Sequence, residues 1–416
     1  MMPRKSFFAI LSGSALIVLI ILILASSAGA AQYRVLYKFK AGIDGGLPYG
    51  GVVIDQTGRL YGTTMGGGAY GNGTVFQLVS NPDGTWTENV LYSFTGGADG
   101  GMPEAGLIFD AAGSLYGTTV IGTNVCGAVF KLAPSPDGSW TESVLHSFTR
   151  KADGCQPYAG LIFDTSGNLY GTTHSSHHGK GVGIVFKLTP NPDGSWMEDV
   201  LHNFTRGSDG SQPYSDVVLD AEGNLYGTTL YGGIDGYGMV FRLTPNPDGS
   251  WTESRPHVFK GPDGVYPSAG LILDAAGNLY GTTGGGGKAH DSGTVFKLTP
   301  YPDGTWKRTT LHGFKGKDGE FPQAGLVFDA AGNLYGTTYV GGKYDCGGYG
   351  CGVVFKLVPN QDGSWKESVL HNFNGKDGAN PYAGLIVDAA GNLYGTTLYG
   401  GKGGNQGSGV VFEITP

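Results

Sequence analysis

Two carboxylic acids occupy positions where the chain otherwise repeats neutral residues. Glu104 follows a recurrent Pro, and Asp216 replaces the Gly of a recurrent Ala-Gly pair. If the fold brings these two carboxyl groups close together, they can serve as general acid and base, as glycan hydrolysis requires. Asp216 could be an acid of such a site or only a tolerated substitution, so both interpretations stay open.

The residue after the recurrent Pro differs between repeats but is aromatic or polar throughout: Tyr49, Glu104, Tyr158, Tyr214, Ser268, Gln323 and Tyr382. Tyrosine rings stack on sugars or peptide side chains, and their hydroxyls form hydrogen bonds. The sequence therefore predicts a ligand-binding rim of Tyr49, Glu104, Tyr158, Tyr214, Asp216, Gln323 and Tyr382. Packing of the tyrosines between loops is the alternative.

Three histidines, His174, His177 and His178, lie within the segment HSSHHGKG. Their imidazoles could ligate zinc or copper, but a loop without acidic or Cys partners is more often simply polar. Five other histidines recur at one strand position and are interpreted as structural: His146, His202, His257, His312 and His371. No cofactor is predicted.

The word LYGTT occurs seven times, beginning at Leu60, Leu115, Leu169, Leu225, Leu279, Leu334 and Leu393. Successive copies are 55, 54, 56, 54, 55 and 59 residues apart, which indicates tandem supersecondary units. Each unit holds four strand-like apolar segments, in the second unit 107–110, 115–119, 129–132 and 140–148. The turn words FDAAGN and NPDG join them as antiparallel hairpins.

The two ends of the chain complete one unit between them. YRVLYKF at 33–39 matches only the fourth strand, and the C-terminal segments match only the first three. Closing the units into a ring removes the open edges of the sheets. Residues 31–416 are therefore predicted to form an all-β, seven-bladed β-propeller of four-stranded antiparallel blades, with the N-terminal strand joining the last blade. Pro256 agrees with an outermost fourth strand.

LYGTT itself is predicted to be structural. An enzyme site is an asymmetric set of residues, so residues that recur in every blade are poor candidates for it. Its Leu and Tyr are expected to pack on opposite neighbouring blades, and its Gly to admit another backbone. The hairpin Asp residues are expected to cap turns, with a calcium ladder as the alternative: Asp55, Asp110, Asp164, Asp220, Asp274, Asp329 and Asp388. The Asp-Gly pairs receive the same structural interpretation: Asp44, Asp99, Asp153, Asp209, Asp263, Asp318 and Asp377.

Four cysteines are interpreted from the predicted propeller. Its topology places the second-to-third and fourth-to-first connections on one face, so Cys126 and Cys155 are expected to adjoin and form a disulfide. Cys346 and Cys351 share the enlarged loop DCGGYGC and are expected to form a second one. Zinc binding is the alternative, although these spacings match no common zinc pattern.

The combination of LHSFTG, DGxxPYAGLIFD and GNLYGTT resembles the tandem GloVer repeat of exported bacterial proteins. GLIFDAAGNLYGTT is also similar to the first hairpin of NHL and SMP-30 type propeller repeats. The resemblance covers nearly all of the chain beyond residue 30 and implies a secreted or surface-linked repeat protein of unestablished activity. The C-terminal sorting signal of many members is not matched at Pro416.

The first 30 residues begin with a basic segment and continue with an apolar run that ends in Ala28-Gly29-Ala30. This pattern predicts a cleaved signal peptide, with an uncleaved membrane anchor as the alternative. Loss of Arg4 and Lys5 would change the net charge from −8 to −10, which disfavours nucleic acid as a partner. A secreted protein, extracellular or periplasmic, is expected, and membrane contact only through a retained leader.

These features favour a non-catalytic module that binds an extracellular or envelope glycan, peptide or protein. A propeller enzyme is the first alternative, such as a lactonase, lyase or glycan hydrolase with its site on the face that carries the second-to-third and fourth-to-first connections. A structural surface protein is the second.

Overall fold

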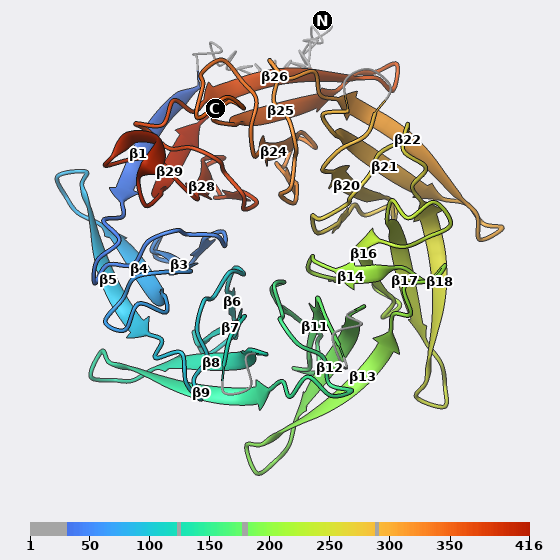
Figure 1. Cartoon of the computed structure of the whole chain (residues 1–416), viewed down its shortest axis with the longest axis horizontal. Coiled ribbons are helices and arrows are strands. Elements are labelled where there is room, and N and C mark those ends of the chain that lie inside the picture. Colours follow the sequence, from blue (N-terminus) through green and yellow to red (C-terminus); the bar gives the residue numbers. More distant parts are fainter. Residues whose placement is uncertain (1–30, 123–125, 177–181, 288–290) are drawn as a thin grey trace, which may run out of the picture. The chain divides into compact units, whose positions relative to one another are not determined.

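The computed structural model describes residues 31–122, 126–176, 182–287 and 291–416. The compact unit that begins at Ala31 is a ring of seven antiparallel sheets (Figure 1). Six sheets have four strands and one has five; from the axis outward the strands follow the order of the chain, except that the N-terminal strand β1 is the outermost strand of the last blade. The predicted seven-bladed β-propeller is confirmed.

The strands are short, and each blade holds an inner, a second, a third and an outer strand. Blade 1 comprises β2 (Val53–Ile54), β3 (Leu60–Thr64), β4 (Thr74–Ser80) and β5 (Trp86–Ser93), and blade 2 comprises β6 (Ile108–Phe109), β7 (Leu115–Thr119), β8 (Ala128–Pro134) and β9 (Trp140–Ser147). Blade 3 comprises β10 (Ile162–Phe163), β11 (Leu169–Thr173), β12 (Ile184–Pro190) and β13 (Trp196–Asn203). Blade 4 comprises β15 (Val218–Leu219), β16 (Leu225–Tyr231), β17 (Met239–Pro245) and β18 (Trp251–Val258), with β14 (Ser211–Pro213) added to β16.

Blade 5 comprises β19 (Ile272–Leu273), β20 (Leu279–Thr283), β21 (Thr294–Pro300) and β22 (Trp306–Gly313). Blade 6 comprises β23 (Val327–Phe328), β24 (Leu334–Thr338), β25 (Val353–Pro359) and β26 (Trp365–Asn372). Blade 7 comprises β27 (Ile386–Val387), β28 (Leu393–Thr397), β29 (Val410–Thr415) and β1 (Gln32–Lys38). The 3-10 turn η2 (Gly404–Gln406) is the single helical element of the described residues.

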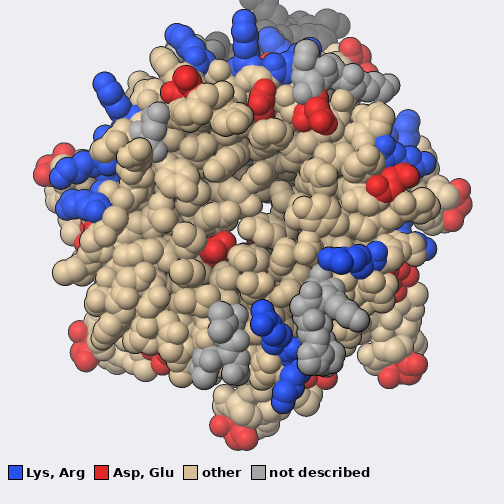
Figure 2. All heavy atoms as spheres, in the orientation of Figure 1, with Lys and Arg blue, Asp and Glu red and all other residues tan. Residues whose placement is uncertain are grey.

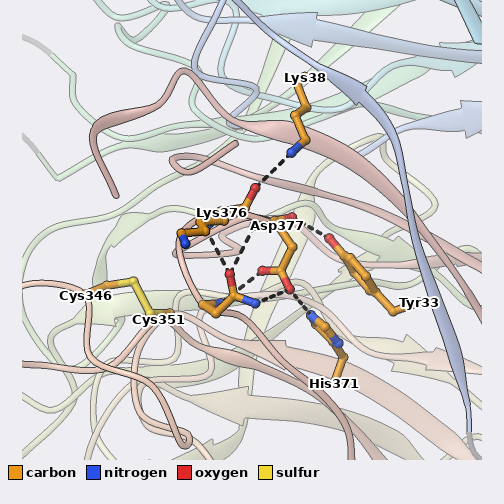
Figure 3. A network of polar contacts seen from close by, with 8 residues as sticks. Tyr33, Lys38, Cys346, Cys351, His371, Lys376 and Asp377 are labelled. Carbon is orange, nitrogen blue, oxygen red and sulfur yellow. Dashed lines mark hydrogen bonds and ion pairs between the residues drawn. A yellow bond between two sulfur atoms is a disulfide. The ribbon is translucent and has the colours of Figure 1, made fainter. Parts of the chain in front are cut away.

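The N-terminal strand closes the ring. β1 pairs antiparallel with β29, from Gln32 opposite Thr415 to Lys38 opposite Val410 (Figure 1). The Tyr33 hydroxyl also donates a 2.6 Å hydrogen bond to a backbone carbonyl of blade 6, that of Asp377 (Figure 3). The first and last segments of the ring therefore hold each other in place.

The inner strands are shorter than predicted, because each ends where the hairpin Asp begins a turn. Asp110 Oδ1 accepts the backbone N–H groups of Ala112 and Ser114 at 2.9 and 2.8 Å, and its Oδ2 accepts the Tyr116 hydroxyl at 3.0 Å. The Tyr–Asp hydrogen bond recurs in all seven blades. The predicted turn caps are confirmed.

The first Thr of LYGTT links adjacent blades. The Thr118 hydroxyl donates to the Ala159 carbonyl of the next blade at 3.0 Å, and the same bond is made at every blade. The prediction for the Gly was wrong in one respect. A Cβ on Gly62 would lie 2.6 Å from the Phe76 ring, so the Gly admits an aromatic side chain of its own sheet, not another backbone.

The hydrophobic core lies between blades. Leu115 packs in the cluster shared with blade 1 and Tyr116 in the cluster shared with blade 3, as predicted. Each boundary also holds an edge-to-face pair of buried phenylalanines, such as Phe94 with Phe130 at 5.1 Å between ring centroids. Burial of these rings favours the closed ring over separate blades.

The connections expected on one face do adjoin there. Isolated bridges join the loop before the inner strand to the loop after the second strand, as between Cys155 and Ser175. Disulfides link Cys126 to Cys155 and Cys346 to Cys351, with Cα atoms 4.5 and 5.0 Å apart. Both predicted pairings are confirmed. We call this side of the propeller the loop face.

Pro256 lies in the outermost strand of blade 4, as predicted, at a break in the register opposite Phe241. No helix among the described residues is long and apolar enough to span a membrane. The predicted leader, residues 1–30, lies outside the described residues.

Candidate ligand-binding site at the channel mouth

Each residue that follows the recurrent Pro is preceded, two places earlier, by a residue with a strained backbone. The residue that precedes the recurrent Pro has a left-handed backbone, with φ from 53° to 59°: Leu47, Met102, Gln156, Gln212, Tyr266, Phe321 and Asn380. This conformation is unfavourable for side-chain-bearing residues. The backbone N–H of each donates to a carbonyl near the preceding blade's third strand, as Met102 does to Asn72 at 2.8 Å, which holds the strained turn in place.

The rim side chains meet at one cavity of about 250 Å³ on the axis of the ring. Its lining includes the seven residues that follow the recurrent Pro, together with Asp216: Tyr49, Glu104, Tyr158, Tyr214, Ser268, Gln323 and Tyr382. The remaining wall is mostly backbone of the Ala-Gly pairs. The structure thus brings every predicted rim residue together, while their binding of a ligand stays a prediction.

The four tyrosines narrow this cavity by contacting one another. The rings of Tyr49 and Tyr382 lie 4.2 Å apart, and those of Tyr158 and Tyr214 are stacked at 5.0 Å. Burial, and then the neighbouring hydroxyls of Tyr382 and Tyr214, raise the pKa of Tyr49 well above its usual value. Tyr214 comes from the opposite side of the ring, so tyrosine hydroxyls converge across the axis and stay protonated.

Glu104 is half-buried at the same rim. Burial raises its pKa to about 7, so the carboxyl is partly protonated at neutral pH. Its charge also contributes to the raised pKa values of Tyr158, Tyr214 and Tyr382, which places it near all three rings. In this state Glu104 can donate or accept a hydrogen bond.

Asp216 also lines this cavity. Its side chain is exposed to the channel, and the desolvation that the surrounding protein causes there raises its pKa. The backbone N–H of Gly160 donates to its Oδ1 at 2.5 Å and partly opposes that rise. A Cβ on Gly160 would lie 3.1 Å from the carboxyl, so the neighbouring Gly makes room for the substitution.

Of the three histidines predicted as possible metal ligands, the structure describes only His174. His174 packs edge-on against the rings of Tyr158 and Tyr214, 5.3 and 5.8 Å away, and its Nδ1 is buried without a hydrogen-bond partner among the residues that the structure describes. It therefore supports the rim tyrosines. His177 and His178 lie outside the described residues.

A second hollow of about 480 Å³ adjoins the cavity and shares Tyr214, Ser268, Gln323 and Tyr382 with it. Tyr266 and Phe321, two of the strained residues, add exposed rings to its wall. The Ser268 hydroxyl is buried, and none of the described residues forms a hydrogen bond with it. This wall was not predicted from the sequence, although the aromatic residues Tyr266 and Phe321 before the recurrent Pro of two neighbouring units were a visible signal.

The charged groups that line the cavity are all acidic. The residues that line the cavity include two carboxyls and no Lys, Arg or His. Figure 2 shows an acidic side chain beside the central opening, with the basic side chains of this view farther out. The cavity therefore suits a neutral or cationic ligand that is rich in hydrogen-bonding groups.

Fold and site together define a seven-bladed β-propeller of tandem repeats with a recessed, tyrosine-lined cavity on its loop face. The model of the Gloeobacter/Verrucomicrobia repeat matches residues 23–233, 176–361 and 217–416. The chain belongs to this family.

Solved structures share the fold at low sequence identity, and no curated protein matches the chain. One, from Bacteroides uniformis, carries a provisional assignment as a 6-phosphogluconolactonase. It is 16% identical, with a TM-score of 0.54 over 81% of this chain and 88% of the other. Another is PorZ, a surface component of the type-IX secretion system of Porphyromonas gingivalis. It is 15% identical, with a TM-score of 0.50 over 87% of this chain and 46% of PorZ. These likenesses show the fold alone.

Proposed function

We propose that the protein is an exported, non-catalytic binding module that holds a neutral glycan at the channel mouth. The observation that carries the proposal is the convergence on one cavity of the seven side chains that follow the recurrent Pro, a position that varies between repeats. Two disulfides agree with an oxidising compartment outside the cytoplasm.

The chemistry of the lining favours sugar over other ligands. Stacked tyrosines offer flat apolar faces, while Glu104, Gln323 and Ser268 offer hydrogen bonds around them. A volume of about 250 Å³ equals roughly eight water molecules, which suits one sugar ring. The adjoining hollow gives room for further residues of an oligosaccharide along Tyr266 and Phe321.

An enzyme that cleaves a glycan or lactone is the second candidate, because Glu104 combines an accessible position with a pKa of about 7. Such a carboxyl suits a general acid. The other channel carboxyl, Asp216, already accepts the Gly160 N–H, and desolvation favours its neutral form. This weakens it as a base or nucleophile, so binding without turnover is preferred.

The test is a glycan-array screen of the full chain, followed by calorimetry with the best oligosaccharide. Tyr214→Ala removes a stacked ring from both hollows and should weaken binding by about tenfold, as expected for one aromatic contact. Tyr70→Ala is the matched control, since Tyr70 is exposed in a loop and lines neither hollow.

Retention of wild-type affinity by Tyr214→Ala, or the absence of glycan binding, would contradict the proposal. Release of reducing sugar from the bound oligosaccharide, abolished by Glu104→Gln, would instead establish the enzyme.

A further inference from the structure

A polar cluster recurs at the outer edge of the ring, between consecutive blades. A His or Tyr of one outer strand lies beside the Asp of the following connection: Tyr37–Asp44, Tyr92–Asp99, His146–Asp153, His202–Asp209, His257–Asp263, His312–Asp318 and His371–Asp377. The outer strand of the next blade supplies a third side chain, in the same order Glu88, Glu142, Glu198, Glu253, Arg308, Glu367 and Tyr33.

The cluster between blades 5 and 6 is the most compact of the His, Asp and Glu type. His312 Nε2 lies 2.9 Å from Asp318 Oδ2, and ligand atoms of His312, Asp318 and Glu367 all lie within 4.8 Å of one another. Glu367 Oε1 is buried and has no hydrogen-bond partner within the described part of the chain. Three potential metal ligands therefore converge, one of them with an unused acceptor.

The cluster is also oriented by its surroundings. The Phe314 ring packs edge-to-face on His312 at 4.8 Å, and the Lys315 backbone N–H donates to Asp318 Oδ1 at 2.7 Å. Such outer contacts fix the direction in which metal ligands point. Partial exposure of the His312 and Asp318 side chains, 17% and 20%, leaves an entry from solvent.

An imidazole nitrogen and two carboxylates match the ligands that Zn²⁺ takes in open sites, with bonds of about 2.0–2.2 Å. Ligand atoms around such an ion are separated by about 3.3–3.5 Å. Small side-chain rotations would bring the present separations into that range. The ion would balance two carboxylates that share one boundary with an imidazole.

The equivalent cluster between blades 4 and 5 shows that the fold accepts a cation at this place. Arg308 occupies the position of Glu367, and its guanidinium interacts electrostatically with Asp263 and His257. Between blades 6 and 7 the same position holds Tyr33, which stacks on His371 at 3.7 Å and fills the space (Figure 3).

We propose that His312, Asp318 and Glu367 form a binding site for a divalent transition-metal ion of the Zn²⁺ type, which joins the outer edges of blades 5 and 6. The clusters at His146 and His202 have the same three residue types but wider His–Asp separations, 3.8 and 3.7 Å. They are expected to bind the ion more weakly.

The experiment is calorimetric titration of chelator-treated full chain with Zn²⁺, together with Co²⁺ absorption as a spectroscopic reading of the ligands. His312→Gln and Glu367→Gln each remove a ligand and should weaken the tightest site by at least the roughly 10–100-fold that loss of an outer contact to a ligand costs. His257→Gln, in the cluster that contains Arg308, is the matched control and should leave the affinity unchanged.

Glu367→Arg separates metal binding from folding, because it copies the side chain that blade 5 carries at the same position. This variant should melt at or near the temperature of the metal-free wild type and fail to bind Zn²⁺. Absence of Zn²⁺ and Co²⁺ binding by the wild type would overturn the proposal. So would unchanged affinity in His312→Gln, or loss of the tightest site in His174→Gln instead.

Discussion

The outer strands carry glutamates that should make the propeller less stable as pH rises, and Glu142 gives the clearest case. Its side chain is half-buried, and its Oε1 is buried with no hydrogen-bond partner in the described ranges. Burial, and then the charge of Asp99, raise its pKa to about 7 from an ordinary value of 4.5. Below pH 4.5 the carboxyl is protonated in the folded and the unfolded chain alike, so it has no effect there.

Between pH 4.5 and about 7 the unfolded chain loses the proton first, so the free energy of unfolding falls as pH rises. A rise in pKa from 4.5 to about 7 corresponds to about 3 kcal/mol, which partial exposure reduces to about 1–2 kcal/mol. Glu142→Gln removes the charge and keeps the shape. We therefore expect the variant to be about 1–2 kcal/mol more stable than wild type at pH 8 and nearly equal to it at pH 5.

Urea unfolding of both proteins at pH 5 and pH 8 measures this difference. Glu222→Gln makes the same charge change at an exposed turn and should differ little from wild type at either pH. The reasoning is refuted if Glu142→Gln destabilises the protein at pH 8, or if its effect is the same at both pH values.

Two further predictions concern the links within the ring. Thr118→Val removes the hydroxyl that donates to the buried Ala159 carbonyl. We expect it to lower the free energy of unfolding by about 1–2 kcal/mol in urea titrations. An unchanged urea midpoint would show that this hydrogen bond between blades is dispensable. Replacing Cys126 and Cys155 by Ser opens a loop with a sequence separation of 29, so the double variant should lose about 3–4 kcal/mol, and a loss of under about 1 kcal/mol would contradict the chain-entropy argument.

The repeat made much of this fold readable. The seven copies of LYGTT predicted the number of blades. The turn motifs predicted the hairpins, because Asp110 and its equivalents accept hydrogen bonds from backbone N–H groups two to four residues away. The pairing of Cys126 with Cys155 followed from topology alone. These features depend on interactions between residues close in sequence, or on the topology of the repeat, and both recur in every unit.

Predictions failed or fell short where a contact crosses between strands or blades. The Gly of LYGTT was expected to admit a backbone, but the ring that fills its place belongs to Phe76, 14 positions along the chain. The left-handed residues before the recurrent Pro were missed, since their conformation is held by hydrogen bonds from the preceding blade.

The blade count, the strand order, the closure of the ring, the disulfides and the positions that form the rim could all be predicted from the repeats. That Tyr214 reaches Tyr49 across the axis, and that Glu367 faces His312 and Asp318 from a neighbouring blade, became visible in the folded ring. The first set follows from local periodicity and from topology. The second depends on how far each blade turns relative to the next, which is set by the packing of the phenylalanine pairs between blades once the ring is closed.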